Sequence, residues 1–229
     1  MFKEFLKELG SGKNERVEGE LVKTIFYSLL TSVLFLALIY FFILRKIDNF
    51  ILDYGYFLFF AVLSYALIIP TIRQVRAYKE FACMSGMMIG MTTGMIVGFL
   101  AGFYIGSTNG MFYGSVFGMV VGISLGIWMG KCCGIMGVME GIMAGFMGGV
   151  MGGMTAVMLL NDNLKIATVI IFLVSSVILF ALNYMIYQEM KETSRQRRED
   201  HYITIFLSLI LTAATTWLMV FGPRSALFG

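Results

Sequence analysis

Seven long runs of apolar residues dominate the chain, separated by short polar stretches. The runs lie at about 24–44, 54–72, 82–106, 110–130, 134–160, 164–187 and 202–221. Each is long enough to cross the hydrocarbon layer of a bilayer, which takes about 20 helical residues. The runs do not alternate apolar and polar positions, as the strands of a membrane barrel do. The pattern therefore predicts an all-α integral membrane protein of about seven transmembrane helices.

The composition agrees with this class. Of the 229 residues, 59% are hydrophobic and 14% charged, whereas soluble domains average about 45–50% apolar and about 25% charged residues. No run of Lys and Arg is interleaved with aromatic residues, so no nucleic acid partner is expected. We expect an integral protein of a prokaryotic cytoplasmic membrane, with the lipid bilayer as its first partner.

The chain divides into four parts by composition. Residues 1–23 form a cytoplasmic or interfacial N-terminal segment, whose apolar residues have the spacing of an amphipathic interfacial helix; a solvated tail is the alternative. Residues 24–81 hold two Leu/Phe-rich helices and 82–160 a Gly/Met-rich core of three. Residues 161–229 hold two further helices and a charged cytoplasmic loop at 188–201. We expect the Leu/Ile/Phe-rich helices to form a lipid-facing jacket around the Gly-rich centre.

The basic residues indicate the orientation. With seven crossings, alternate connections lie on opposite sides of the membrane. Of the 17 Lys and Arg residues, 13 then fall on the side of the N-terminus and 4 on the other side. Cytoplasmic segments of membrane proteins carry such an excess. The split predicts a cytoplasmic N-terminus and a C-terminus outside.

Glycine recurs at every fourth position from Gly86 to Gly134, and again from Gly137 to Gly153. In water an interior glycine costs a helix about 1 kcal/mol relative to alanine, but rows of small residues let helices in lipid approach to backbone contact. We predict that the three central helices form a tight antiparallel triple, joined by three-residue turns at 107–109 and 131–133. The glycines expected at these helix contacts are Gly86, Gly90, Gly94, Gly98, Gly102, Gly114, Gly118, Gly122, Gly126, Gly137, Gly141, Gly145, Gly149 and Gly153.

Methionine is concentrated in the same region, which holds 15 of the 19 methionines. Two ladders with a spacing of four residues run beside the glycines. Thioethers are soft ligands that favour Cu(I), and rungs one helical turn apart would offer the successive weak sites that conduction requires. The alternative is that methionine fills gaps between helices that are mostly backbone. The two ladders are Met139, Met143, Met147 and Met151, and Met87, Met91 and Met95.

Three cysteines and one acid add chemistry to this region. With the predicted topology, Cys83, Cys132 and Cys133 lie at the cytoplasmic ends of the central helices. A reducing compartment disfavours disulfides there, and these thiols could receive or deliver a soft metal ion. Glu140 is the only acid expected inside a central span, and an intramembrane carboxylate is a candidate functional group. We expect Glu140 to join the two ladders in a transport pathway, as a gate or proton site; a glutamate that extends to the interface is the alternative.

The motifs MxxxM and GxxxG occur together at Met139/Met143, at Met87/Met91 and in the surrounding glycine row. This combination is similar to the motif pair of the Ctr-type copper transporters, whose three-helix subunits assemble as trimers. The resemblance covers two short motifs; this chain has more helices and lacks a Met-rich extracellular tail. It implies thioether coordination of copper and glycine packing at those positions, and no family membership.

Two functions fit these features. The first is a transporter or channel for a small cation, most specifically a soft metal such as Cu(I). Copper is the one metal that the thioether and thiol donors single out. The second is a structural or oligomerising subunit whose glycine rows pack against copies or a partner. An enzyme is not expected, because the chain has one histidine and lacks HExxH, GxSxG and P-loop motifs. We favour transport, by a homo-oligomer or a subunit of a membrane complex.

Overall fold

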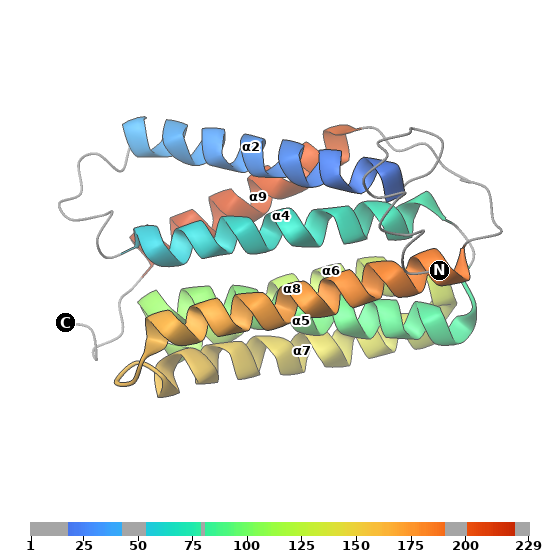
Figure 1. Ribbon diagram of the computed structural model, residues 1–229. Helices are drawn as coiled ribbons and strands as arrows, with labels where there is room; N and C mark the ends of the chain where they lie inside the picture. Colours follow the sequence, from blue (N-terminus) through green and yellow to red (C-terminus); the bar gives the residue numbers. More distant parts are fainter. Residues whose placement is uncertain (1–17, 43–53, 79–80, 191–200, 223–229) are drawn as a thin grey trace.

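The computed structural model describes residues 18–42, 54–78, 81–190 and 201–222. Residues 1–17 of the N-terminal segment expected at the membrane interface and most of the charged loop lie outside these residues, whereas residues 18–23 of that segment belong to the first helix. Within them the chain is all-helical, without a strand, and the helices run side by side (Figure 1). They are α2 (Glu18–Phe42), α4 (Gly55–Ala77), α5 (Cys83–Asn109), α6 (Met111–Gly130), the 3-10 turn η2 (Lys131–Cys133), α7 (Gly134–Met158), α8 (Leu164–Glu189) and α9 (His201–Phe221).

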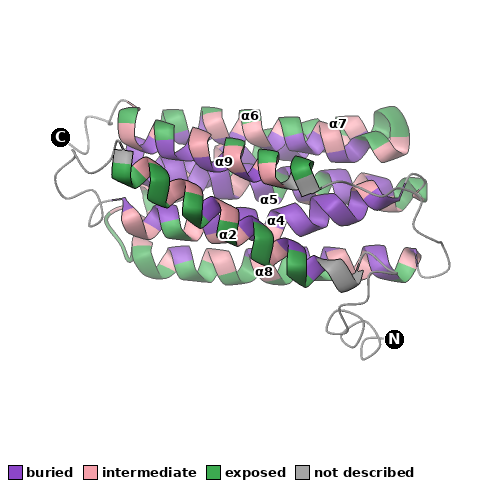
Figure 2. Cartoon of the chain, turned by 90° about the horizontal axis from the view of Figure 1, so that it is seen from above, coloured by how far each residue is buried: buried purple, intermediate pink, exposed green. Residues whose placement is uncertain are grey.

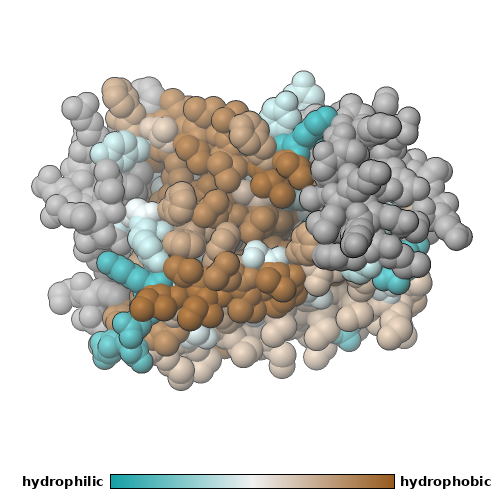
Figure 3. All heavy atoms as spheres, in the orientation of Figure 1, coloured by the Kyte–Doolittle hydropathy of each residue, from teal (hydrophilic) through white to brown (hydrophobic). Residues whose placement is uncertain are grey.

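The helices have the length and composition of membrane-spanning segments. Five apolar stretches long enough to cross a bilayer occur among the described residues. One of them, Met111–Met158, is 48 residues long and consists of α6, η2 and α7, whereas the apolar part of α9, Ile205–Phe221, is shorter. Figure 3 shows apolar side chains across the middle of one face and hydrophilic ones towards its ends. The number of crossings and the orientation remain predictions.

Helices α4 and α5 form the centre of the bundle (Figures 1 and 2). Helices α2 and α9 pack against α4, α6 and α7 pack against α5, and α8 contacts both central helices. Fully buried large side chains come mostly from the centre, including Tyr65 and Ile68 of α4 and Phe103 and Tyr104 of α5. The predicted lipid-facing jacket is therefore wrong for the run at 54–72. A continuous apolar run does not distinguish lipid from protein surroundings, because the two are equally apolar.

Helix α4 also continues beyond residue 72, the predicted end of that run, and includes Arg73 and Arg76. Arg73 is 4% exposed, and its Nη1 donates a hydrogen bond to Thr24 Oγ1 of α2 at 2.7 Å. The guanidinium of Arg76 lies 4.8 Å from the centre of the Trp128 ring of α6, a distance suited to a cation–π contact. Both cations thus have partners within the protein, which allows them inside a helix.

The two turns within the Gly-rich region differ from each other. The turn predicted at 107–109 is wrong, because α5 continues through Asn109. Gly110 alone reverses the chain there, with φ 92°, in the left-handed region that glycine adopts without a steric penalty. The turn predicted at 131–133 is present as η2 and is followed by Gly134 with φ 71°. The three-helix triple is thus joined by one very tight turn and one short 3-10 turn.

Candidate functional site

The glycines of α5, α6 and α7 meet one another. A Cβ atom added to Gly118 of α6 would lie 2.7 Å from the Gly98 carbonyl oxygen, 2.8 Å from Gly102 Cα and 2.8 Å from Gly149 Cα. Thirteen of the fourteen glycines expected at helix contacts would bring such an atom closer than 3.0 Å to another part of the chain, a distance that real Cβ atoms essentially never show, and Gly90 would bring it to 3.0 Å. The three helices therefore touch backbone to backbone, which leaves no room between them for a line of ions.

The ladder Met139, Met143, Met147 and Met151 lies on the outer face of α7, where its side chains are 49% to 58% exposed. The prediction that it runs beside the glycines is wrong. Each of these methionines stands two residues from a glycine of the packed row, such as Gly141, and two residues correspond to about 200° around an α-helix. The ladder is therefore opposite the glycines and faces the surroundings of the bundle.

The second ladder, Met87, Met91 and Met95, lies along the flank of α5 that borders α7. Gly148 and Gly152 of α7 meet the backbone of Met95 and Phe99, which places this part of α5 directly against α7. Met95 and Phe99 also line a cavity of about 290 Å³ between α5 and α8. Met91 and Met95 are nevertheless 47% and 37% exposed, so part of this ladder also faces the surroundings of the bundle.

Glu140 lies near the start of α7. Its backbone is seven residues after Cys133, the last residue of η2, and so lies at the end of the bundle where η2 is. The side chain is half-buried, and among the described residues neither Glu140 nor Lys131 of η2, its nearest basic neighbour in sequence, forms an ion pair. The described part of the chain thus gives Glu140 no lysine partner.

Two of the three cysteines are brought together at this end. Cys83 begins α5 and Cys133 ends η2, and their Sγ atoms are 2.7 Å apart. The Cys133 thiol also lies 2.8 Å from the Cys83 carbonyl oxygen. The hydrogen bond to the Cys83 thiol and burial raise the pKa of Cys133 to about 11, because a donated S–H is harder to remove. We call Cys83 and Cys133 the thiol pair.

Cys132 is oriented differently. Its Sγ donates to the Met129 carbonyl oxygen at 3.2 Å, and burial, followed by the nearby Glu189 carboxylate, raises the pKa of this thiol. Glu189 Oε1 accepts a hydrogen bond from the Ala82 N–H at 3.0 Å, and its Oε2 is buried without a hydrogen-bond partner in the described part of the chain. No three His, Cys, Asp or Glu side chains in that part gather closely enough to hold a metal ion. The soft donor set is therefore two thiols, unlike the four ligands of a structural zinc site.

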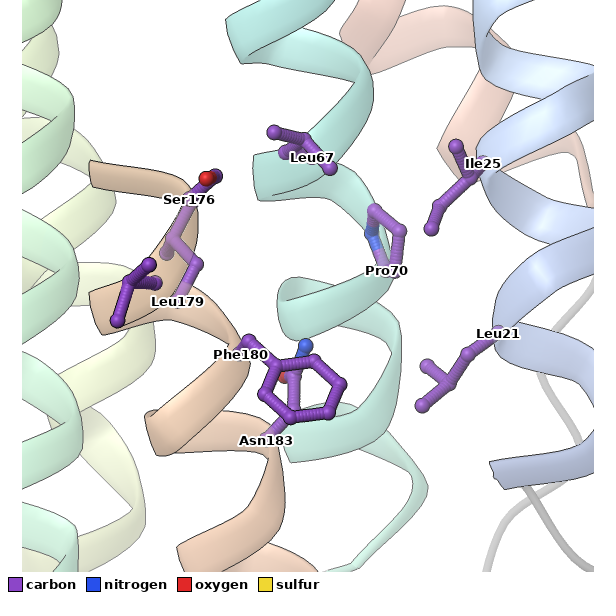
Figure 4. Close-up of a pocket in the computed structure, with 9 residues that line it drawn as sticks. Leu21, Ile25, Leu67, Pro70, Ser176, Leu179, Phe180 and Asn183 are labelled. Carbon is purple, nitrogen blue, oxygen red and sulfur yellow. The ribbon is translucent and has the colours of Figure 1, made fainter. Parts of the chain in front are cut away.

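A larger cavity of about 380 Å³ lies elsewhere, between α2, α4 and α8. Figure 4 shows Leu21 and Ile25 from α2, Pro70 from α4, and Phe180 and Asn183 from α8 around it. Its lining is almost entirely apolar and contains neither sulfur nor carboxylate. The cavity is thus suited to hydrocarbon and is separate from the sulfur-rich end of the bundle.

Sequence reasoning placed all three cysteines at one end, but it did not single out the thiol pair. The pairing depends on how η2 seats against α5, where a Cβ on Gly86 would lie 2.6 Å from Cys133 Cβ. Glu189 was not predicted at all, because it is an ordinary acid at a helix end in sequence. No protein-family model, curated protein or solved structure matches the chain. The side chains themselves are therefore the evidence on function.

Proposed function

We propose that this protein carries a soft monovalent metal ion, with Cu(I) as the first candidate, across the membrane. The observation that carries the proposal is the meeting of Cys83 and Cys133, whose sulfurs are 2.7 Å apart although fifty positions separate them in sequence. Thiolate ligands select Cu(I) over hard cations, and a pair of them suits an ion that accepts two ligands. A small rotation of either side chain separates the sulfurs enough to place an ion between them.

The path from this site runs along the outside of the Gly-packed triple, because helices in backbone contact leave no channel between them. The ladder of α7 begins two turns after Cys133 and continues along the outer face through Met151. One such ladder is a row of exposed thioethers; two facing ladders from neighbouring copies would enclose successive soft sites. A two-fold symmetric dimer brings the same face of each copy together. The transport path is therefore proposed at a contact between copies, built from the α7 ladder.

Glu140 fits this path as a charge near its entrance. It lies seven residues after Cys133, which is about 10 Å along a helix. A half-buried carboxylate without an ion-pair partner in the described residues would favour a cation leaving the thiols. With the predicted topology, the thiol pair and Glu140 lie on the cytoplasmic side, where cysteines remain reduced.

A structural subunit is the second candidate, supported by the same exposed ladder. The glycine rows are engaged within one chain, so contacts with copies or another protein would use the outer face of α7. In that case the methionines adapt to a partner surface, as flexible thioethers do, without binding metal.

Anaerobic titration of the detergent-purified protein with Cu(I), against a chromophoric chelator, separates the two candidates. We expect one tight equivalent of Cu(I) in the wild type, its loss in Cys83→Ser and in Cys133→Ser, and its retention in Cys132→Ser, the matched control. Absence of tight binding in the wild type would reject the metal proposal and leave the structural subunit.

Transport is tested separately by Cu(I) uptake into proteoliposomes. The double variant Met143→Leu/Met147→Leu and the variant Glu140→Gln should keep the tight equivalent, because the thiol pair is intact, but should lose most of the uptake. Binding in the wild type without uptake above that of empty vesicles would reject transport while leaving a metal-binding protein.

A further inference from the structure

A column of hydroxyl side chains lies between α2, α4 and α9, on the other side of the bundle from the Gly-packed triple (Figure 1). On both α2 and α9 the hydroxyls recur every fourth residue, which places them along one face of each helix. All of them are at most 3% exposed. They are Thr24, Ser28 and Ser32 of α2, and Ser208, Thr212 and Thr216 of α9.

Direct contacts tie the three helices together along this column. At one end Arg73 of α4 donates to Thr24 Oγ1 at 2.7 Å. In the middle the hydroxyls of Thr31 and Ser208 lie 3.5 Å apart, which joins α2 to α9. Further along, the fully buried hydroxyl of Tyr65 in α4 lies beside Thr215 of α9. The column therefore continues through the interior for several helical turns.

The hydroxyls of α9 and those of α2 differ in their hydrogen bonds. In α9 the hydroxyls of Ser208, Thr212 and Thr216 donate to carbonyl oxygens of their own helix, so their oxygens can still accept hydrogen bonds. In α2 the Oγ atoms of Ser28 and Ser32 are completely buried and have no hydrogen-bond partner among the described residues. Free donors of α2 thus share an apolar interior with free acceptors of α9.

We infer that water molecules bind in this column and join the hydroxyls of Ser28 and Ser32 to the hydroxyl oxygens of α9. Water is the ligand that fits, because it donates and accepts and because each molecule needs two to four polar partners, which the column supplies. Buried polar groups of native proteins are almost always bonded to protein or to ordered water.

The same geometry separates this site from the proposed metal path. The guanidinium of Arg73 places a fixed positive charge at one end of the column, and such a charge opposes the entry of protons and other cations. The waters are therefore bound hydration of the interface between α2, α4 and α9 and do not conduct the cation. The inference does not rest on the thiol pair or on the methionine ladders.

Water-edited solid-state NMR of the labelled protein in bilayers, without added metal, tests the inference. Magnetisation starting on water should reach Ser28 and Ser32 several-fold faster than it reaches Thr93, with the serine signals assigned by their loss in Ser28→Ala and Ser32→Ala. Thr93 is the matched control, because it is 1% exposed in α5 but donates to the Ile89 carbonyl oxygen of its own helix at 2.6 Å. Build-up at both serines as slow as at Thr93 would overturn the inference and indicate that their hydroxyls turn onto their own helix.

The thermal unfolding midpoint gives a second readout with a defined sign. If water bridges the helices, the double variant Ser28→Ala/Ser32→Ala loses these bridges and unfolds at a lower temperature. If the column is dry, the variant removes two unpartnered polar groups and the midpoint is unchanged or higher. Ser176→Ala is the control, since Ser176 donates to Leu173 O within α8 and should leave the midpoint unchanged.

Discussion

Replacing Gly118 by alanine tests whether backbone contact holds the three central helices together. The added Cβ would lie 2.7 Å from the Gly98 oxygen of α5 and 2.8 Å from the Gly149 Cα of α7. Ordinary contact begins at 3.4 Å, so the shortfall is 0.7 Å (3.4 minus 2.7) on one side and 0.6 Å (3.4 minus 2.8) on the other. Helix α6 cannot relieve both by moving away from one neighbour, and backbone atoms cannot rotate out of the way.

Two opposing effects set the magnitude. Alanine favours the helix over glycine by about 1 kcal/mol in water, whereas overpacking of a tight interior costs about 1–3 kcal/mol. Because the clash is with backbone on two sides, we expect the upper part of that range and a net loss of about 1–2 kcal/mol. At about 2–4 °C per kcal/mol for a chain of this size, the unfolding midpoint should fall by roughly 2–8 °C.

The assay is thermal unfolding in one detergent at one heating rate, followed by circular dichroism at 222 nm. The matched control is Val120→Ala, which also raises helix propensity in α6 but changes a side chain that is 59% exposed. Gly106→Ala should have a smaller effect than Gly118→Ala, because its nearest neighbours would be 3.1 Å away. A midpoint for Gly118→Ala at or above that of the wild type would refute the reasoning.

Two further predictions concern single hydrogen bonds. The hydroxyls of Ser64 and Tyr104 lie 2.7 Å apart in the interior. A double-mutant cycle of Ser64→Ala and Tyr104→Phe should therefore give a coupling free energy of about 0.6 kcal/mol, the average for hydrogen bonds between helices of a membrane protein. Zero coupling would show that the bond contributes nothing to stability. At the thiol pair, Cys83→Ala removes the leading cause of the raised pKa of Cys133, which is about 11. The pKa of Cys133 should then fall and its thiolate fraction should rise. Alkylation of Cys133 by iodoacetamide at pH 8, measured in a Cys132→Ser background, should therefore become faster. An unchanged or slower rate would contradict the assignment.

Much of the fold follows from local pattern. A run of about 20 uncharged residues has to be helical in lipid, because only a helix bonds all of its own backbone groups there, and the described helices lie where the runs predict them. The glycine row similarly indicates close approach wherever it occurs. The sequence also places the α7 methionines and the packed glycines on opposite faces of one helix, since the two-residue step from Met139 to Gly141 turns a helix by about 200°.

Only part of the candidate site could be predicted from the sequence. Sequence placed Cys83, Cys132 and Cys133 near one end, but the selection of Cys83 and Cys133 depends on how the 3-10 turn seats against α5. The burial of Arg73 in α4 depends likewise on Thr24, which is a neighbour in space and distant in sequence. Such contacts carry no local signal, because they join residues of different helices.

The sequence by itself thus determined the class of protein, the helices and the residues that share a face of each helix. The tertiary structure alone decided which face meets protein and which meets the surroundings. It placed α4 in the centre, engaged the glycines within one chain and left the α7 methionines outside. The physical reason is that periodicity relates residues within one helix. The choice of neighbour depends on packing between helices, and there the apolar side chains of a membrane protein are equally compatible with lipid and with protein.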